Sequence, residues 1–254
     1  MYLPMAAVAA ALVMGIHAGL GRKSIVVFAM MALGFGALTA GRNEDYRSDL
    51  AIWTDTVAKR PDNPRAQYYL GLALAQSGQV DKALAHFQAA VQLKQDYADA
   101  YNNAGTSLFL LGRIPEAIEQ YQKALEYKHD YPDAQCNLGS ALFREGRFEE
   151  AAQHYQAAIG LQPDFLAAHT SLAAAFAQLG RTADAIAQCE EALRLQPDDA
   201  RIHCDLGNML VRVGRVSDAM EHYEQALRLN PDLTEARDSL ARLRAYQQAA
   251  GSGK

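Results

Sequence analysis

From residue 64 to residue 233 the sequence repeats with a period of 34 residues, and this regularity constrains the fold more than any other feature. The five units span residues 64–97, 98–131, 132–165, 166–199 and 200–233. Every unit has glycine at position 15 and alanine at positions 20 and 27, and glycine or alanine at position 8. Position 24 is Phe or Tyr except in the fourth unit, which has Cys189. Such a repeat predicts a stack of similar units, each packed on its neighbours.

Each unit predicts two amphipathic helices, because positions 4, 7, 8 and 11 share one helical face and positions 20, 24, 27 and 28 share another. The glycine at position 15 lies between them, where a helix end favours a positive φ. Proline at position 32 of the last three units is expected to end the second helix, and Asp at position 33 is placed to start the next. Alanine, with 48 copies, has the highest helix propensity, so the fold class is predicted to be all-α.

This pattern resembles the tetratricopeptide repeat, which has the same period and the same Leu-Gly, Ala, aromatic, Ala and Pro positions. It departs at position 4, which is Gln or His in four units, and at position 32, which is Gln95 and His129 in the first two. The resemblance implies a right-handed superhelical solenoid. Its concave groove would be lined by positions 2, 5, 6, 9, 12 and 13 of each first helix and would bind protein or peptide partners.

The flanking segments extend the same pattern. Residues 42–63 are predicted to be a half-repeat, or junction helix, with Trp53 in the place of position 24 and Pro61 in the place of position 32. Residues 234–246 are predicted to be a capping helix, because their mostly polar side chains suit the solvent-facing end of a repeat array. Residues 247–254 are predicted to be a disordered tail.

The first 41 residues differ in composition from the rest, because Arg22 and Lys23 are their only charged side chains. Two apolar runs, 2–20 and 25–40, flank this pair. A membrane-spanning helix needs about 20 residues, range about 17–25, so we predict a transmembrane helical hairpin over residues 1–41. The alternatives are a secretory signal peptide, which lacks its leading positive charge here, and attachment of the short second run to the membrane surface.

Charge distribution predicts the orientation of this hairpin. Arg22 and Lys23 occupy the tight loop, and positively charged loops stay on the cytoplasmic side. Both ends of the chain would then lie on the other side. We therefore expect a protein of the bacterial inner membrane with two spans and with its repeats on the periplasmic, or exported, side.

The expected groove offers a set of polar and aromatic candidates for peptide binding. Asn103 and Asn137 both occupy position 6 and resemble the start of the asparagine ladder of O-linked N-acetylglucosamine transferase repeats, which grips a peptide backbone. An amide suits this task because it both donates and accepts hydrogen bonds. Polar lining of the groove is the alternative interpretation. The full candidate set is Tyr68, Tyr69, Asn102, Asn103, Asn137, Arg144, Asn208 and Arg212.

Nothing in the sequence predicts catalysis, a cofactor, a metal or nucleic-acid binding. Residues 42–254 carry 29 acidic and 22 basic side chains, which is not the basic footprint of a nucleic-acid-binding protein. Five of the seven histidines lie at repeat positions 4 and 23 and are expected to form rows, with position 23 on the outer face, instead of a metal cluster. Three cysteines, Cys136, Cys189 and Cys204, are expected to be free thiols, because stacked repeats hold Cys136 and Cys204 too far apart for a disulfide.

The junction itself, residues 39–66, resembles that of bacterial relatives of the transmembrane and tetratricopeptide-repeat O-mannosyltransferase family. It carries the runs Thr-Ala-Gly-Arg-Asn, Leu-Ala-Ile-Trp-Thr-Asp-Thr-Val and Lys-Arg-Pro-Asp-Asn-Pro. The resemblance implies that this chain corresponds to the C-terminal part of such a protein, with the catalytic acidic residues upstream of it.

Three functions therefore stay open from the sequence, one of them a membrane-tethered assembly factor for secretion, pili or cytochrome maturation. The first is a membrane-anchored, non-catalytic module that binds protein or peptide partners in its groove. The alternative is the acceptor-binding fragment of a membrane polyprenyl-phosphate-sugar-dependent protein O-glycosyltransferase. The translated sequence upstream of Met1 separates them, since only the alternative requires further hydrophobic helices with an acidic pair in an early loop.

Overall fold

The computed structural model describes residues 48–252, with side chains through residue 248. Within this range the chain forms twelve α-helices and no strand, which confirms the all-α prediction. The chain divides into two units, residues 1–62 and 63–254. In the first unit the described helix is α3 (Asp49–Lys59), whose N-cap Ser48 accepts a hydrogen bond from the Ala51 backbone. The predicted hairpin over residues 1–41 lies outside the described residues.

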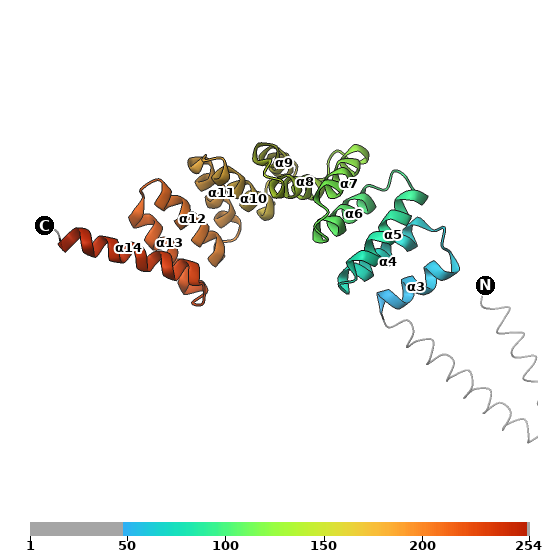
Figure 1. Cartoon of the computed structure of the whole chain (residues 1–254), viewed down its shortest axis with the longest axis horizontal. Coiled ribbons are helices and arrows are strands. Elements are labelled where there is room, and N and C mark those ends of the chain that lie inside the picture. Colours follow the sequence, from blue (N-terminus) through green and yellow to red (C-terminus); the bar gives the residue numbers. More distant parts are fainter. Residues whose placement is uncertain (1–47, 253–254) are drawn as a thin grey trace, which may run out of the picture. The chain divides into compact units, whose positions relative to one another are not determined.

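The second unit is a series of helix pairs. The first helix of each pair begins at the first residue of a repeat: α4 (Pro64–Gln76), α6 (Ala98–Leu110), α8 (Pro132–Arg144), α10 (Leu166–Gln178) and α12 (Ala200–Arg212). The second helices are α5 (Val80–Leu93), α7 (Ile114–Tyr127), α9 (Phe148–Leu161), α11 (Thr182–Leu195) and α13 (Val216–Leu229). From α4 to α14 each helix contacts the next one in the chain, and the pairs stack in chain order (Figure 1).

The turn inside each pair depends on the glycine at position 15. Its φ lies between 73° and 79° in all five repeats, a left-handed conformation that glycine adopts without steric cost. In the third repeat Gly146 donates its N–H to Phe143, and Arg147 donates its N–H to the Leu142 carbonyl. These bonds form a Schellman arrangement, with the positive φ predicted from the sequence, and they satisfy the last carbonyls of the first helix.

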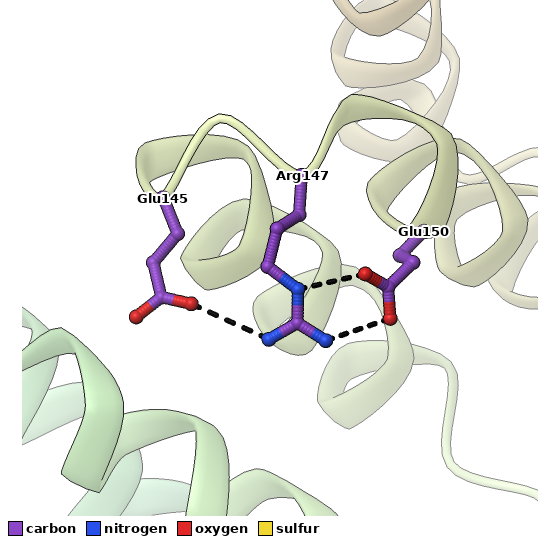
Figure 2. Close-up of polar contacts among 3 residues, drawn as sticks. All are labelled: Glu145, Arg147 and Glu150. Atoms are coloured by element: carbon purple, nitrogen blue, oxygen red, sulfur yellow. Dashed lines mark hydrogen bonds and ion pairs between the residues drawn. The ribbon is translucent and has the colours of Figure 1, made fainter.

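An ion pair closes the same turn in repeats two to five. Figure 2 shows it in the third repeat, where Arg147 binds both carboxylate oxygens of Glu150 at 2.7 Å and also reaches Glu145 at 3.3 Å. Glu150 lies in the first turn of α9, where a negative charge interacts favourably with the helix dipole. Hydrogen bonding from Arg147 lowers the pKa of Glu150. The pair is exposed, so it orients the turn and adds little stability.

Close packing inside each pair depends on the absence of a side chain at position 8. A Cβ built on Gly139 would lie 2.8 Å from Cε1 of Tyr155, closer than carbon atoms approach. Gly71, Gly105 and Gly207 meet the ring at position 24 of their own repeats in the same way. The ring therefore lies directly on the first-helix backbone, and Tyr155 is only 2% exposed.

The ends of the helices differ from two sequence expectations. All five second helices end at position 30, including those of the first two repeats, which lack proline at position 32. Packing and the residues before position 32 therefore determine where the second helix ends, and proline at position 32 is not needed. Asp at position 33 does not cap the next helix, because the N-cap is position 34, occupied by Tyr97 before α6. Side-chain caps occur only before α4, from Asn63, and before α12, from Asp199, among the helices of the second unit whose caps are described.

The last helix, α14 (Thr234–Ser252), packs Ala236 and Leu240 against the final pair. It continues beyond residue 246, so the predicted disordered tail at 247–254 is wrong for residues 247–252, which are helical. Gln247, Gln248, Ala249 and Ala250 all favour helix, which explains the extension. Between residues 48 and 252, no helix combines the length and apolar character needed to cross a membrane.

We predict that Gly139→Ala lowers the free energy of unfolding by about 1–3 kcal/mol, because the new methyl group must displace the Tyr155 ring from a closely packed site. Urea unfolding of residues 42–254, followed by circular dichroism, measures this change.

Gly160→Ala is the matched control. Gly160 lies in α9, is exposed, and has open space around the position of a Cβ. Alanine there should raise stability by about 0.5–1 kcal/mol through its helix propensity. Equal effects of the two substitutions would show that the ring contact does not limit position 8.

Candidate functional site

The first helices of neighbouring repeats are joined by contacts between residues 35 apart in sequence. The Asn103 amide donates to the Tyr68 hydroxyl at 3.1 Å, and the Asn137 amide donates to Asn102 Oδ1 at 3.0 Å. Farther along, Arg212 donates to the Ala177 carbonyl at 3.2 Å. Positions 6 and 13 of one repeat thus meet positions 5 and 12 of the repeat before it. This row of contacts runs along the predicted groove face, which we define as positions 2, 5, 6, 9, 12 and 13 of the first helices.

The predicted asparagine ladder is partly used by these contacts. Both amide hydrogens of Asn103 have partners, Tyr68 Oη and the Asp99 carbonyl. Asn102 is buried, with 7% exposure. Asn137 keeps a second amide hydrogen and its carbonyl oxygen without a partner in the described part of the chain. Of the three asparagines, Asn137 alone can therefore donate to and accept from a peptide without breaking a contact that the chain already makes.

Aromatic side chains gather at the first repeat. The Tyr68 ring lies 5.4 Å from Tyr69 and 4.9 Å from Tyr97, measured between centroids. Burial raises the pKa of Tyr68 to about 12, so this hydroxyl stays protonated at neutral pH. Tyr69 is 41% exposed and lines a cavity of about 640 Å³ with Tyr97, Lys94 and other polar neighbours.

Arg144 extends from α8 on the groove face. Its guanidinium carbon lies 5.6 Å from the centroid of Phe109 in the preceding repeat, a cation–π contact. Both residues line a cavity of about 220 Å³ together with Phe143, Ser171 and Ala174. The Arg144 side chain has no ion pair within the described residues, so its charge is available to a ligand.

Asn208, another predicted groove residue, has a structural role. Its Oδ1 accepts from the Tyr223 hydroxyl at 2.8 Å, and its amide donates to Glu235 at 2.9 Å. In the second and third repeats, Tyr121 and Tyr155 bind the hydroxyls of Thr106 and Ser140 in the same relation. Position 9 thus holds the ring at position 24, and both the oxygen and the nitrogen of the Asn208 amide already have a partner.

A further cavity, of about 200 Å³, lies between α10, α11 and α12. Alanine and other apolar side chains line most of it, with Cys189 at its inner wall and Asp205 from α12. Ala174 borders both this cavity and the one beside Arg144, so the two adjoin across α10. The sequence candidates did not include Asp205, although it occupies position 6 like Asn103 and Asn137.

The histidines occupy positions that pair across each helix pair, which the sequence reasoning missed. Positions 4 and 23 meet in four repeats: Gln67 with His86, Gln135 with His154, His169 with Gln188, and His203 with His222. The ring at position 23 therefore points to its partner helix, and not to the outer face as expected. The spacing of 19 residues was the available signal. No group of three potential metal ligands occurs among the described residues.

The fifth repeat carries a histidine on both sides of this contact. Nδ1 of His203 lies 3.0 Å from Nδ1 of His222, and Nε2 of His203 lies 3.0 Å from the Pro197 carbonyl. Because a carbonyl only accepts, Nε2 of His203 is the donor there, so a neutral His203 accepts from His222 at Nδ1. One added proton fits this arrangement on His222, whereas two would place two N–H groups against each other.

The three cysteines are buried and unpaired. Burial raises the pKa of Cys136 to about 11 and that of Cys189 to about 12. Both groups are therefore thiols at neutral pH and poor nucleophiles.

Two family models match the repeats of this chain. One, described as TPR repeat, matches residues 71–112 and 105–146, and the other, described as tetratricopeptide repeat, matches residues 136–200 and 170–234. A comparison with curated protein sequences gives no match.

Solved structures show the same fold. YrrB, described as a TPR protein with an unusual peptide-binding site, is 21% identical with a TM-score of 0.63, and the match covers 74% of this chain and 96% of YrrB. A MamA fragment from Desulfovibrio magneticus is 19% identical with a TM-score of 0.63, covering 67% of this chain and 96% of the fragment. A thermophilic TPR protein of Thermus thermophilus is 23% identical with a TM-score of 0.54, covering 72% of this chain and all of that one.

The histidine pair predicts a pH-dependent stability. Burial and the neighbouring His203 lower the pKa of His222 below its ordinary value of 6.5, against the opposing pull of Glu221, Asp218 and Glu190. The unfolded chain therefore binds more protons, and stability falls as the pH drops through about 6.5 towards the lower folded pKa. His222→Gln, which creates the His–Gln pairing of the fourth repeat, should reduce this loss between about pH 7.5 and pH 5.5. Urea midpoints at the two pH values test this, and an unchanged pH dependence would contradict it.

Proposed function

We propose that this chain, which belongs to the tetratricopeptide-repeat family, binds an extended peptide segment of a protein partner across α8, α10 and α12. The observation that carries the proposal is the pair of cavities that adjoin at Ala174 on the groove face. A peptide crossing α10 places one side chain in each cavity. Concave sites with mostly apolar walls and a few polar groups are the usual form of a ligand site.

The chemistry of the two cavities supports a peptide ligand. Beside the first, Arg144 offers a planar cation that has no ion pair within the described residues, a group suited to carboxylates. Seven residues earlier on the same helix, α8, Asn137 has an amide hydrogen and a carbonyl oxygen available for a peptide backbone. The second cavity is mostly apolar with a carboxylate, so it differs from the first in charge.

The fold supports a binding role over a catalytic one. Repeat arrays offer extended surfaces built from side chains of successive units. The likeness to YrrB, whose description names a peptide-binding site, is in keeping with such a surface. In this proposal the chain acts without a cofactor and holds its partner by contacts alone.

We further propose that residues 1–41 anchor the module to the inner membrane of a bacterium by two spans. The two apolar runs and the isolated Arg22 and Lys23 support this proposal. In that arrangement the loop is cytoplasmic and the repeats lie on the exported side, where they meet secreted or membrane-bound partners.

The glycosyltransferase fragment remains a second proposal. It is supported by the junction residues 39–66 alone, which resemble the junction of that family. In that case the same groove would hold the acceptor protein for a catalytic part that precedes it.

Ala174→Arg should weaken peptide binding roughly tenfold or more, because a long charged side chain at this position blocks both cavities at once. Random peptides displayed on phage are selected on the full chain in neutral detergent, and their affinities for both proteins are compared by fluorescence anisotropy.

Ala187→Arg is the matched control, since Ala187 is also an exposed helical alanine but lies on α11 outside either cavity. It should leave the affinities unchanged. Equal binding by the wild type and by Ala174→Arg would place the peptide site elsewhere.

The anchor predicts different behaviour for the full chain and for residues 42–254. In a bacterial host the full chain should remain in the membrane fraction after alkaline carbonate extraction, whereas residues 42–254 should be released, because only the former has the apolar runs. An enzyme reporter fused after Lys254 should be active only if it is of the kind that works outside the cytoplasm. Release of the full chain by carbonate, or activity of a cytoplasm-only reporter, would refute the anchor or its orientation.

A further inference from the structure

The fourth repeat departs from the others at the two positions that form the closest contact inside a helix pair. Repeats one, two, three and five combine glycine at position 8 with Phe or Tyr at position 24. The fourth combines Ala173 with Cys189. Both changes belong together, since a methyl group at position 8 is incompatible with the ring at position 24.

The paired change leaves space on the groove side. A thiol replaces a six-membered ring, and the added methyl group of Ala173 refills only part of that volume. The hydrogen bond from position 24 to position 9 is lost as well, because position 9 is Ala174. The result is the cavity of about 200 Å³, lined by Ala173, Ala177, Cys189, Ile202 and Met209. A single water needs about 15 Å³ of such space, so the cavity has room for a side chain.

One group gives this cavity its charge. Asp205 is the one carboxylate among the described residues that line it, and no lysine, arginine or histidine lines it. The Asp205 side chain has no hydrogen bond or ion pair within residues 48–248. Arg201, the nearest cation along the groove face of α12, acts on Asp205 through its charge without a hydrogen bond or ion pair, and Arg212 donates to the Ala177 carbonyl.

The surroundings of Asp205 make it a strong acceptor for a cation. Although the residue is exposed, partial desolvation of its carboxylate, together with the negative charges of Glu235 and Asp199 and against the opposing charge of Arg201, raises the pKa of Asp205 to about 6. A carboxylate that has lost part of its hydration and faces a second negative charge is stabilised by a bound cation. A mostly apolar wall that includes one carboxylate matches a side chain with an apolar stem and a cationic head.

We propose that the pocket of the fourth repeat receives a lysine side chain of the bound peptide, with its methylene stem against Ile202 and Met209 and its ammonium group on Asp205. This inference rests on the proposed function and adds a specificity to it. The ammonium group forms a charge-assisted hydrogen bond with the carboxylate, which is stronger than a neutral one. The groove would then select partners by a lysine at one position.

The test uses three labelled heptapeptides of sequence Ser-Gly-Ala-Xaa-Ala-Gly-Ser, in which Xaa is lysine, norleucine or glutamate. Their affinities for the full chain in neutral detergent are measured by fluorescence anisotropy. The lysine peptide should bind roughly tenfold tighter than the norleucine peptide, which has a similar stem and no charge. This preference should grow as the pH rises from about 5 to about 7, because Asp205 becomes ionised over that range.

Two variants locate the effect. Asp205→Asn should abolish the preference for lysine over norleucine, whereas Asp238→Asn, which removes an equal charge from α14 outside the cavity, should preserve it. Ala173→Gly combined with Cys189→Phe restores the pairing of the first repeat, fills the cavity and should abolish the preference as well. Circular dichroism confirms that each variant is folded, and the double variant has a precedent in Gly71 and Phe87.

Several outcomes would overturn the inference. Norleucine binding as tightly as lysine would identify an apolar occupant, and tighter binding of glutamate would identify an anionic one. A lysine preference that survives in Asp205→Asn or in the double variant would place the cation elsewhere. Failure of the proposed function is distinct from these, because peptides selected on phage would then bind Ala174→Arg as tightly as the wild type.

Discussion

The contact between the backbone at position 8 and the ring at position 24 is the constraint on which the repeats depend. Because glycine offers no Cβ, the ring of Tyr155 lies against the backbone of α8 and is almost fully buried. The contact between this ring and the backbone sets how closely the two helices of a pair approach. The alanines at positions 20 and 27 permit this close approach. A side chain at position 8 therefore requires the loss of the ring at position 24, which is the relation between Ala173 and Cys189 in the fourth repeat. The contact between positions 8 and 24 thus links the regular core to the cavity of the fourth repeat, whose residues at these two positions differ from those of the other repeats.

Several polar side chains on the first helices already make hydrogen bonds within the repeat array, and this limits what they can offer a ligand. Asn103 and Arg212 bind the preceding repeat, and Asn208 holds Tyr223 and Glu235. Buried or half-buried polar groups need such partners, since leaving a donor or acceptor unsatisfied costs about 1–3 kcal/mol. The groove face is therefore less available than its residue types suggest. Three groups stay available to a ligand: the Arg144 guanidinium and the Asp205 carboxylate, each lining a cavity, and the Asn137 amide, which lies on the same helix as Arg144.

The repeat fold followed from the sequence because a 34-residue period carries the packing of one unit into all the others. Helix starts, the positive φ at position 15 and the buried faces all recur with it. The candidate site was harder to predict. Which polar side chains stay available to a ligand depends on contacts between residues 19 and 35 apart in sequence, and no helical periodicity reveals such contacts. Asn208 was predicted to be a groove residue from its position on α12. Its hydrogen-bond partner, the hydroxyl of Tyr223, comes from the next helix, α13. Asp205 was not among the sequence candidates. The cavity that it lines results from the absence of an aromatic ring on α11, and not from the position of Asp205 in its own repeat.

A repeat array that bound a partner with identical surfaces in every unit would have little means of fixing the register of that partner. A peptide could slip by one repeat and find the same contacts again. Discrimination between registers requires at least one unit whose surface differs, and the difference must be compatible with the packing that holds the units together. The exchange of Gly and an aromatic ring for Ala173 and Cys189 meets both conditions, because it changes the groove while it preserves the alanines at positions 20 and 27. The specificity of this chain is therefore expected where its internal symmetry is broken.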